Sequence, residues 1–155
     1  MAEIHSTGGA TSETSYDSAL ENLLNERGKL LQPRVICNGQ LRNQGAGHPD
    51  FGLHSSNQCS QNTPKTGQGA IPERGVIEVE SLGDNSWQTE QGNQPTRYLN
   101  QYGLVLVTNY REFRLIGKDD NSKPVEREYF RLADDEPAFW SGIANSKRAR
   151  TLSLR

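Results

Sequence analysis

The segment that most constrains the fold of this chain is Val-Ile-Glu-Val-Glu at residues 76–80. Alternate side chains of a strand point to the same face, so Glu78 and Glu80 would project together, opposite Ile77 and Val79. Carboxylates crowded on one face repel each other unless a cation or a proton lies between them. From spacing alone, two interpretations are open: the solvated polar face of an edge strand, or a site that binds a cation.

A further acid stands where another strand-like segment begins. Residues 47–50 read Gly-His-Pro-Asp and lead directly into the strand-like residues 51–54. A shared cation site requires Asp50, Glu78 and Glu80 to meet, although they come from separate parts of the chain. Magnesium prefers hard oxygen ligands and commonly takes one or two carboxylates. We therefore expect Asp50 and Glu78 to bind Mg²⁺, and Glu80 to act as a general base.

Hydrophobic periodicity predicts the remaining elements. Apolar residues from position 16 to position 24 follow helical spacing, with Thr14 or Ser15 as the cap and Gly28 as the end of the helix. Further helices are predicted from about Pro95 and over residues 137–143, and strands over residues 34–37, 51–54, 75–82, 104–108, 113–116 and 127–132. This order of helix, strands, helix and strand indicates an α/β fold with a mixed central sheet flanked by helices.

Length and composition favour one compact domain with a small core. The chain has 155 residues, and only 32% of them are hydrophobic. We expect the domain to span residues 13–143, between a disordered tail at 1–12 and a basic tail at 144–155. The polar stretch at residues 55–72 is predicted to be a long loop.

The charge balance gives no global sign of nucleic-acid binding. The formal net charge is -2, so contacts with DNA would have to come from local clusters. The candidate clusters are Arg27 with Lys29, and Lys147 with Arg148 and Arg150. A solvated basic tail is the alternative interpretation of the second cluster.

The cysteines and the hydropathy pattern bear on the location of the protein. Cys37 and Cys59 lack metal-ligand spacing, and we expect two free thiols in a reducing cytoplasm, with a disulfide as the alternative. No segment reaches the length needed to span a bilayer. A cytoplasmic protein without a membrane partner is therefore predicted.

Read together, four segments resemble the PD-(D/E)xK nuclease superfamily. They are residues 13–24, 45–50, 74–80, and 94–98 leading into 105–115, and they occur in the order of that family. More closely, they are similar to the nuclease-like N-terminal domain of large restriction-modification enzymes that carry an adenine-specific DNA methylase. The resemblance implies a restriction-endonuclease-like core, a Mg²⁺-dependent endonuclease activity on DNA, and possible association with a separate methylase subunit.

The resemblance also implies roles for particular residues. It adds the backbone carbonyl of Val79 to Asp50 and Glu78 as metal ligands. The motif of the family usually ends in a lysine, and here that position is Glu80. A carboxylate cannot supply the positive charge of that lysine, although a minority of restriction endonucleases in the superfamily have glutamate there.

A second element follows the core motif. Gln94 and Tyr98 match a Gln-x-x-x-Tyr pattern of related restriction enzymes, and at i and i+4 they would share a helix face. We assign Gln94 to catalysis, and Tyr98, Lys147 and Arg148 to DNA binding; the alternative for Tyr98 is a half-buried structural residue. Glu13 and Glu21 are candidates for an acid on the first helix, or they are solvated helix charges.

Two competing functions remain open from the sequence. The chain is either an active endonuclease domain, or a catalytically impaired DNA-binding or scaffold domain left when the lysine became Glu80. A remnant of a longer restriction-modification enzyme is a third possibility. The glycine motif and the Asn-Pro-Pro-Tyr-type motif of the methylase portion do not occur in these residues, so methyl transfer by this chain alone is not predicted.

Overall fold

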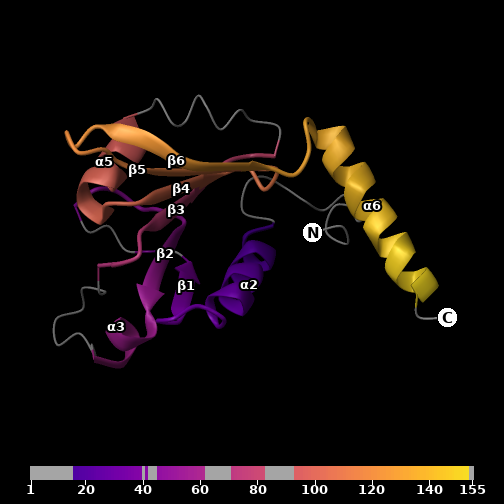
Figure 1. Ribbon diagram of the computed structural model, residues 1–155, viewed down its shortest axis with the longest axis horizontal. Helices are drawn as coiled ribbons and strands as arrows, with labels where there is room; N and C mark the ends of the chain where they lie inside the picture. The colour runs from indigo at the N-terminus through magenta and orange to yellow at the C-terminus, as the bar shows by residue number, and fades with distance from the viewer. Residues whose placement is uncertain (1–15, 40, 42–44, 62–70, 83–92, 154–155) are drawn as a thin grey trace.

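A computed structural model of the protein describes residues 16–39, 41, 45–61, 71–82 and 93–153, with the backbone alone for 60, 61, 93–95 and 146–153. The helices and strands shown in Figure 1 follow in the order α2 (Asp17–Gly28), β1 (Val35–Gly39), β2 (Phe51–Ser55), α3 (Ser56–Gln61), β3 (Val76–Val79), α5 (Asn93–Tyr102), β4 (Val105–Thr108), β5 (Glu112–Lys118), β6 (Pro124–Arg131) and α6 (Glu136–Ser153). The prediction of an α/β fold is confirmed.

The strands form one six-stranded mixed sheet in the order β1-β2-β3-β4-β5-β6. The pair β3–β4 is parallel, and every other neighbouring pair is antiparallel. Parallel neighbours need a crossover connection, and α5 lies in the segment that joins β3 to β4. The predicted mixed sheet flanked by helices is therefore present.

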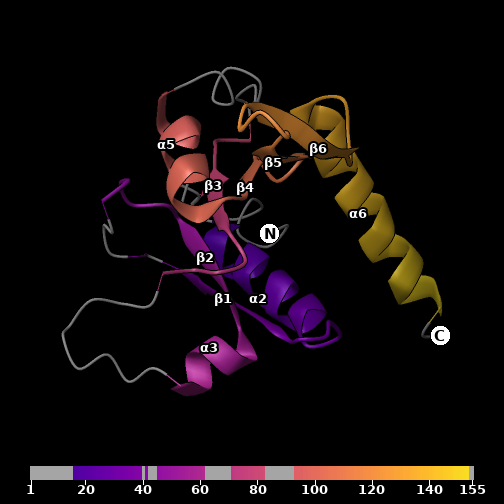
Figure 2. The same cartoon turned by 60° about the vertical axis from the view of Figure 1, so that its left-hand side comes forward.

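The sheet separates two hydrophobic cores, and Figure 2 shows α2 and α5 on its opposite sides. The α2-side core contains Leu20, Cys37, Phe51, Ile77, Val79, Leu82, Tyr110 and Phe139. The α5-side core contains Ala46, Val76, Tyr98, Leu99, Tyr102, Val105, Val107 and Ile116. Alternation along β3 sends Ile77 and Val79 to one core and Val76 to the other, as expected for a strand that is covered on its two faces.

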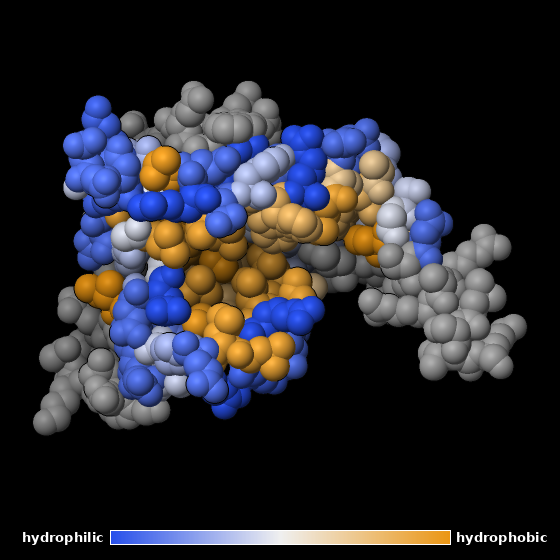
Figure 3. Space-filling view, in the orientation of Figure 1, coloured by the Kyte–Doolittle hydropathy of each residue, from blue (hydrophilic) through white to orange (hydrophobic). Residues whose placement is uncertain are grey.

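The α2-side core is open to solvent along one side. Figure 3 shows an apolar band between α2 and the strands at the far edge of the sheet. Partly buried apolar residues such as Leu53, Leu106 and Phe113 pack against this core. Leu23, predicted to lie on the apolar face of the first helix, is 54% exposed, because the helix turns Leu20 and Leu24 toward the sheet instead.

Several element boundaries differ from the predicted ones. The residue that precedes α2 is Tyr16, and it makes no side-chain capping bond; Thr14 and Ser15 lie outside the described residues. The polar stretch predicted as a loop begins with the short helix α3. The last helix was predicted to end at residue 143, but α6 continues to Ser153.

In Figure 1, α6 diverges from the sheet as it approaches its C-terminal end. Its first turns are anchored, because Phe139 belongs to the α2-side core and Trp140 and Ile143 pack against it. Among the described residues, the helices are too short or too polar to cross a bilayer.

Candidate functional site

The pairing of β2 with β3 brings Asp50 beside Glu78. Phe51 lies opposite Ile77 and Gly52 opposite Val76, so the same antiparallel register carries Asp50 to the level of Glu78. The side chain of Asp50 is fixed there, because its Oδ2 accepts a hydrogen bond of 2.7 Å from the backbone N–H of Val79. Two acids from separate segments thus lie at the same level, at one end of two adjacent strands.

Glu78 lies on a central strand of the sheet. β3 pairs with β2 on one side and with β4 on the other, so the edge-strand interpretation is wrong. Glu78 lies opposite Val107 of the α5-side core, and the Oε2 atom of Glu78 is buried. Glu80 comes just after β3, and its backbone N–H still donates to the carbonyl of Thr108 at 2.7 Å.

The backbone of Val79 also faces the Asp50 side. The N–H groups of Val76 in β3 and of Glu80 just after it donate to the carbonyls of Leu104 and Thr108, on the β4 side. The N–H of Val79 donates instead to Asp50. The N–H and C=O of one residue in an extended strand point toward the same neighbour. The carbonyl of Val79 is therefore directed toward the edge where Asp50 lies, as its implied role as a ligand requires.

Helix α5 contacts the loop that carries Asp50. A side-chain carbon built on Gly47 would lie 3.2 Å from the hydroxyl oxygen of Tyr98 and 3.2 Å from its ring. Gly47 also has φ +125°, a backbone conformation that favours glycine. Tyr98 is only 1% exposed, so it is fully buried instead of half-buried. Gln94 lies on the same helix, and its side chain is outside the described residues.

The oxygen atoms at this edge are of the chemical kind that magnesium prefers. Mg²⁺ commonly takes one or two carboxylates together with water and phosphate oxygens. Asp50, Glu78 and the carbonyl of Val79 supply hard oxygens of that kind. Within the described ranges, no group of three or more His, Cys, Asp or Glu side chains is arranged to hold a metal ion. Asp50, Glu78 and Glu80 therefore do not form a site shared by three carboxylates.

An acid on the first helix contacts the turn between β4 and β5, but it is neither Glu13 nor Glu21. The hydroxyl of Tyr110 donates to Asp17 Oδ1 at 2.6 Å. Glu21 instead accepts from the backbone N–H of Gly39 at 3.2 Å, and Glu13 lies outside the described residues. Asp17 does not stand out in the sequence, because acids are common in the first turn of helices.

Electrostatics link this pair to Asp50. Burial raises the pKa of Tyr110 well above its ordinary value, and the hydrogen bond and charge of Asp17 and the charge of Asp50 raise it further. Tyr110 also shares the α2-side core with Phe51 and Val79, the neighbours of Asp50 in the chain and in space.

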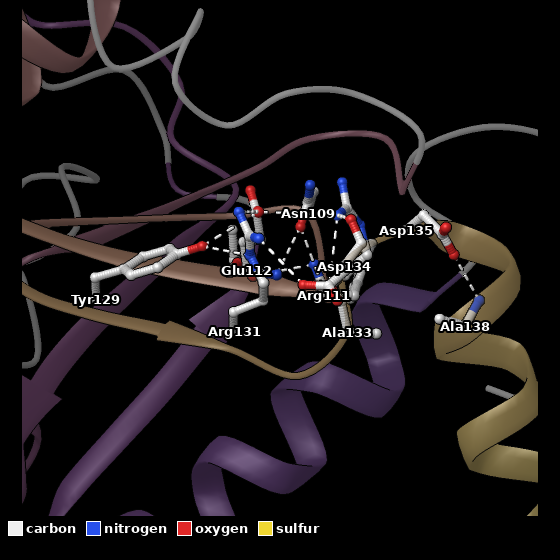
Figure 4. Close-up of polar contacts among 11 residues, drawn as sticks. Asn109, Arg111, Glu112, Tyr129, Arg131, Ala133, Asp134, Asp135 and Ala138 are labelled. Atoms are coloured by element: carbon white, nitrogen blue, oxygen red, sulfur yellow. Dashed lines mark hydrogen bonds and ion pairs between the residues drawn. The ribbon is translucent and has the colours of Figure 1, made fainter.

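A second group of charged residues lies where the β4–β5 hairpin meets the segment before α6. We name it the hairpin cluster: Asn109, Arg111, Glu112, Tyr129, Arg131 and Asp134 (Figure 4). The Glu112 side chain is 4% exposed, and its Oε1 lies 2.8 Å from Arg131 and 3.8 Å from Arg111. Arg111 also donates to the carbonyl of Asp134 at 2.6 Å. No sequence pattern predicted this cluster.

The two candidate basic clusters belong to helix α2 with the residue after it, and to helix α6. Lys147 and Arg148 lie on α6, and their side chains are outside the described residues. Arg27 is exposed on α2, and Lys29 pairs with Glu26 at 2.5 Å.

The thiols are free, as predicted. Cys37 is buried and Cys59 is exposed. Burial, followed by the charge of Glu21, raises the pKa of the Cys37 thiol to about 12. Cys37 is therefore a core residue and not a nucleophile.

Comparison of the chain with protein-family models, with curated proteins and with solved structures found no match.

Proposed function

We propose that this chain is a metal-dependent endonuclease domain with a restriction-endonuclease-like core, acting on DNA in a restriction-modification system. The observation that carries the proposal is the meeting of Asp50 with β3, fixed by its bond to Val79 and opposite Glu78 in register. The order of helix, strands, helix and strand is also the one that the resemblance implies. DNA, and a separate methylase subunit, are the partners that belong to this proposal.

In this proposal the residues at the ends of β2 and β3 have different roles. A divalent cation would be held by the carboxylates of Asp50 and Glu78 and by the carbonyl of Val79. The two negative charges at neighbouring positions attract the cation. When bound, such an ion polarises a phosphodiester and lowers the pKa of the attacking water. Glu80 accepts the proton of that water. Tyr98 holds the loop that positions Asp50 through its contact with Gly47.

The glutamate at position 80 favours a second function, a domain that binds DNA without cutting it. Glu80 stands at the position where the family carries a lysine, and it lies directly after β3. The arginines of the hairpin cluster are engaged with acids and carbonyls, so their charge is largely neutralised within the protein. A domain that binds DNA without cutting it would follow if no other cation stabilises the leaving group.

Plasmid cleavage with Mg²⁺ or Mn²⁺ separates the two functions. The wild type should nick the plasmid, and Asp50→Asn should lose about 100-fold or more of the rate. Asp120→Asn is the matched control, because Asp120 is exposed in the turn between β5 and β6; it should cut like the wild type.

An inert wild type would contradict the endonuclease proposal. If Glu80→Lys then cuts, the impaired DNA-binding function is supported. A gel-shift titration at low salt tests that function directly, since DNA contacts weaken steeply as salt rises. Absence of cleavage and of binding would overturn the two functions together.

A further inference from the structure

The α2-side face of the sheet is covered only in part by α2 and by the start of α6. Helix α2 lies along β1, where the side chain of Asn25 bonds to the N–H and to the carbonyl of Cys37. At the start of α6, Phe139 belongs to the α2-side core. Apolar side chains of the other strands form the band that Figure 3 shows between α2 and the far edge of the sheet.

The strand register gathers these apolar side chains on one surface. Leu106 lies opposite Leu115, and Phe113 lies opposite Phe130. Residues directly opposite each other on neighbouring strands project from the same face. Leu106 and Phe113 pack against the α2-side core, so their partners lie on that face too, and Phe130 is 61% exposed. We name this surface the open face: Leu53, Leu106, Phe113, Leu115 and Phe130. A contiguous exposed apolar patch of this kind marks an interaction site.

The border of the open face on α2 carries a positive charge. Glu21 and Asn25 bond to the backbone of β1, the strand at one end of the sheet. The helical repeat places Leu23 and Arg27 on the opposite side of the stripe that faces the core, and that side is turned toward β4, β5 and β6. Leu23 is 54% exposed, and Arg27 is exposed as well.

The border on β6 carries a negative charge. Glu128 lies opposite Leu115 and therefore projects from the same face, and it is exposed. The ion pairs formed among the described residues include neither Glu128 nor Arg27. The open face is thus apolar in the middle, positive along α2 and negative along β6.

We propose that the open face binds an amphipathic helix of a partner protein, with an acidic residue on one flank of its apolar stripe and a basic residue on the other. The acidic flank pairs with Arg27 and the basic flank with Glu128. A helix satisfies its own backbone hydrogen bonds, whereas a strand laid across the middle of a sheet face would leave its N–H and C=O groups unpaired. A helix is also the element that covers a sheet face elsewhere in this protein, as α2 and α5 do (Figure 2).

The open face is separate from the acids of the candidate site. Glu78 lies opposite Val107 and therefore on the α5 side of the sheet. Binding of a partner helix consequently does not depend on the proposed function.

The test uses three fluorescein-labelled helical peptides with a common apolar stripe, and measures their binding to the intact chain by fluorescence anisotropy. The mixed peptide has one acidic and one basic flank, the acidic peptide has two acidic flanks, and the basic peptide has two basic flanks. The wild type should bind the mixed peptide about threefold to tenfold more tightly than the other two. Glu128→Lys makes the two borders positive and should prefer the acidic peptide, whereas Arg27→Glu should prefer the basic peptide.

Two further variants separate the apolar contact from the charges. Phe130→Glu should weaken binding of the mixed peptide about tenfold or more. Because Phe130 is 61% exposed, the variant should remain folded, which urea denaturation checks. Asp120→Lys is the matched control for Glu128→Lys, since Asp120 is exposed in the turn between β5 and β6; it should keep the preference for the mixed peptide.

Preferences that follow the charges at positions 27 and 128 support the proposal. Absence of binding by all three peptides would overturn it, as would preferences that ignore these two charges. Sedimentation of the wild type without peptide tests a different occupant. Self-association that Phe130→Glu abolishes would assign the open face to a second copy of the chain and overturn the partner helix.

Discussion

The candidate site and the hairpin cluster both contain acids at the ends of strands of one sheet, but the partners of these acids differ. In the hairpin cluster the buried Glu112 lies 2.8 Å from the guanidinium of Arg131. At the site, the carboxylate of Asp50 meets a backbone N–H and stands opposite a second acid, Glu78. Opposite charges stabilise the first region from within, whereas like charges in the second region repel each other unless a cation or a proton lies between them.

The comparison teaches which acids serve stability and which are available for function. Removing one partner of a buried ion pair leaves an uncompensated charge and destabilises the protein. Removing one of two neighbouring like charges relieves repulsion. Stability and activity should therefore respond in opposite ways to the loss of an acid in the two regions.

The largest expected effect comes from Glu78→Gln. Cleavage should fall about 100-fold or more, since a ligand of the proposed cation is lost. In the absence of metal, the free energy of unfolding should stay equal or rise by about 0.5 kcal/mol, because repulsion with Asp50 is relieved. Urea denaturation and plasmid cleavage measure the two quantities on the same preparation. A variant that is strongly destabilised and inactive would show that Glu78 has a structural role instead.

The opposite response is expected for Glu112→Gln. The loss of its charge leaves Arg131 and the buried Arg111 without their common partner, and should cost about 2 kcal/mol of unfolding free energy. Cleavage by the folded fraction should change less than about threefold. Asp134→Asn tests specificity within the cluster: the Asp134 side chain is 88% exposed, so its pair with Arg131 should contribute little.

A smaller loss of cleavage is expected at Gly47, where the loop that leads into Asp50 contacts Tyr98 of α5. Gly47→Ala places a carbon 3.2 Å from Tyr98 at a backbone position with φ +125°, and should cost about 1–3 kcal/mol. Because Gly47 leads into Asp50, cleavage should fall about tenfold even where the protein is folded. Gly45→Ala is the control, since it has φ +100° and nothing near its added carbon; it should share the backbone strain and keep the cleavage rate. Equal losses of cleavage in the two variants would refute a role for the contact with Tyr98.

Local pattern predicted much of the fold and part of the site. The alternation along β3 correctly separated Ile77 and Val79 from Glu78, because strand periodicity is a property of neighbouring residues. It could not show that β3 is a central strand, since pairing depends on segments distant in the chain. The short helix α3 was missed for a similar reason: its residues Ser-Asn-Gln-Cys-Ser-Gln have no apolar periodicity, and Gln58 is held by a bond to the carbonyl of Ile71.

The contacts that were not predicted from the sequence join residues that are far apart in the chain. The pair formed by Tyr110 and Asp17 depends on a positive φ at a hairpin tip and on the docking of α2. Neither condition leaves a mark in local composition, because an ordinary turn would contain the same residues. Charges on β5 and β6 also resemble those of any solvated strand until the register places Glu112 opposite Arg131.

The smallest expected effect is a pH dependence that belongs to the fold rather than to the site. Burial lowers the pKa of His54 below its ordinary value of 6.5, against the opposing effects of its hydrogen bond with Gln58 and of the charge of Glu73. The unfolded chain therefore binds the proton more readily, so the contribution of His54 is present above about pH 6.5 and is lost as the pH falls toward the lower pKa of the folded state. Urea denaturation at about pH 7.5 and about pH 5.5 should show a loss of less than about 1 kcal/mol that is reduced in His54→Gln. The exposed His48 provides the matched control: His48→Gln should keep the full pH dependence, and an equal reduction in the two variants would contradict the assignment to His54.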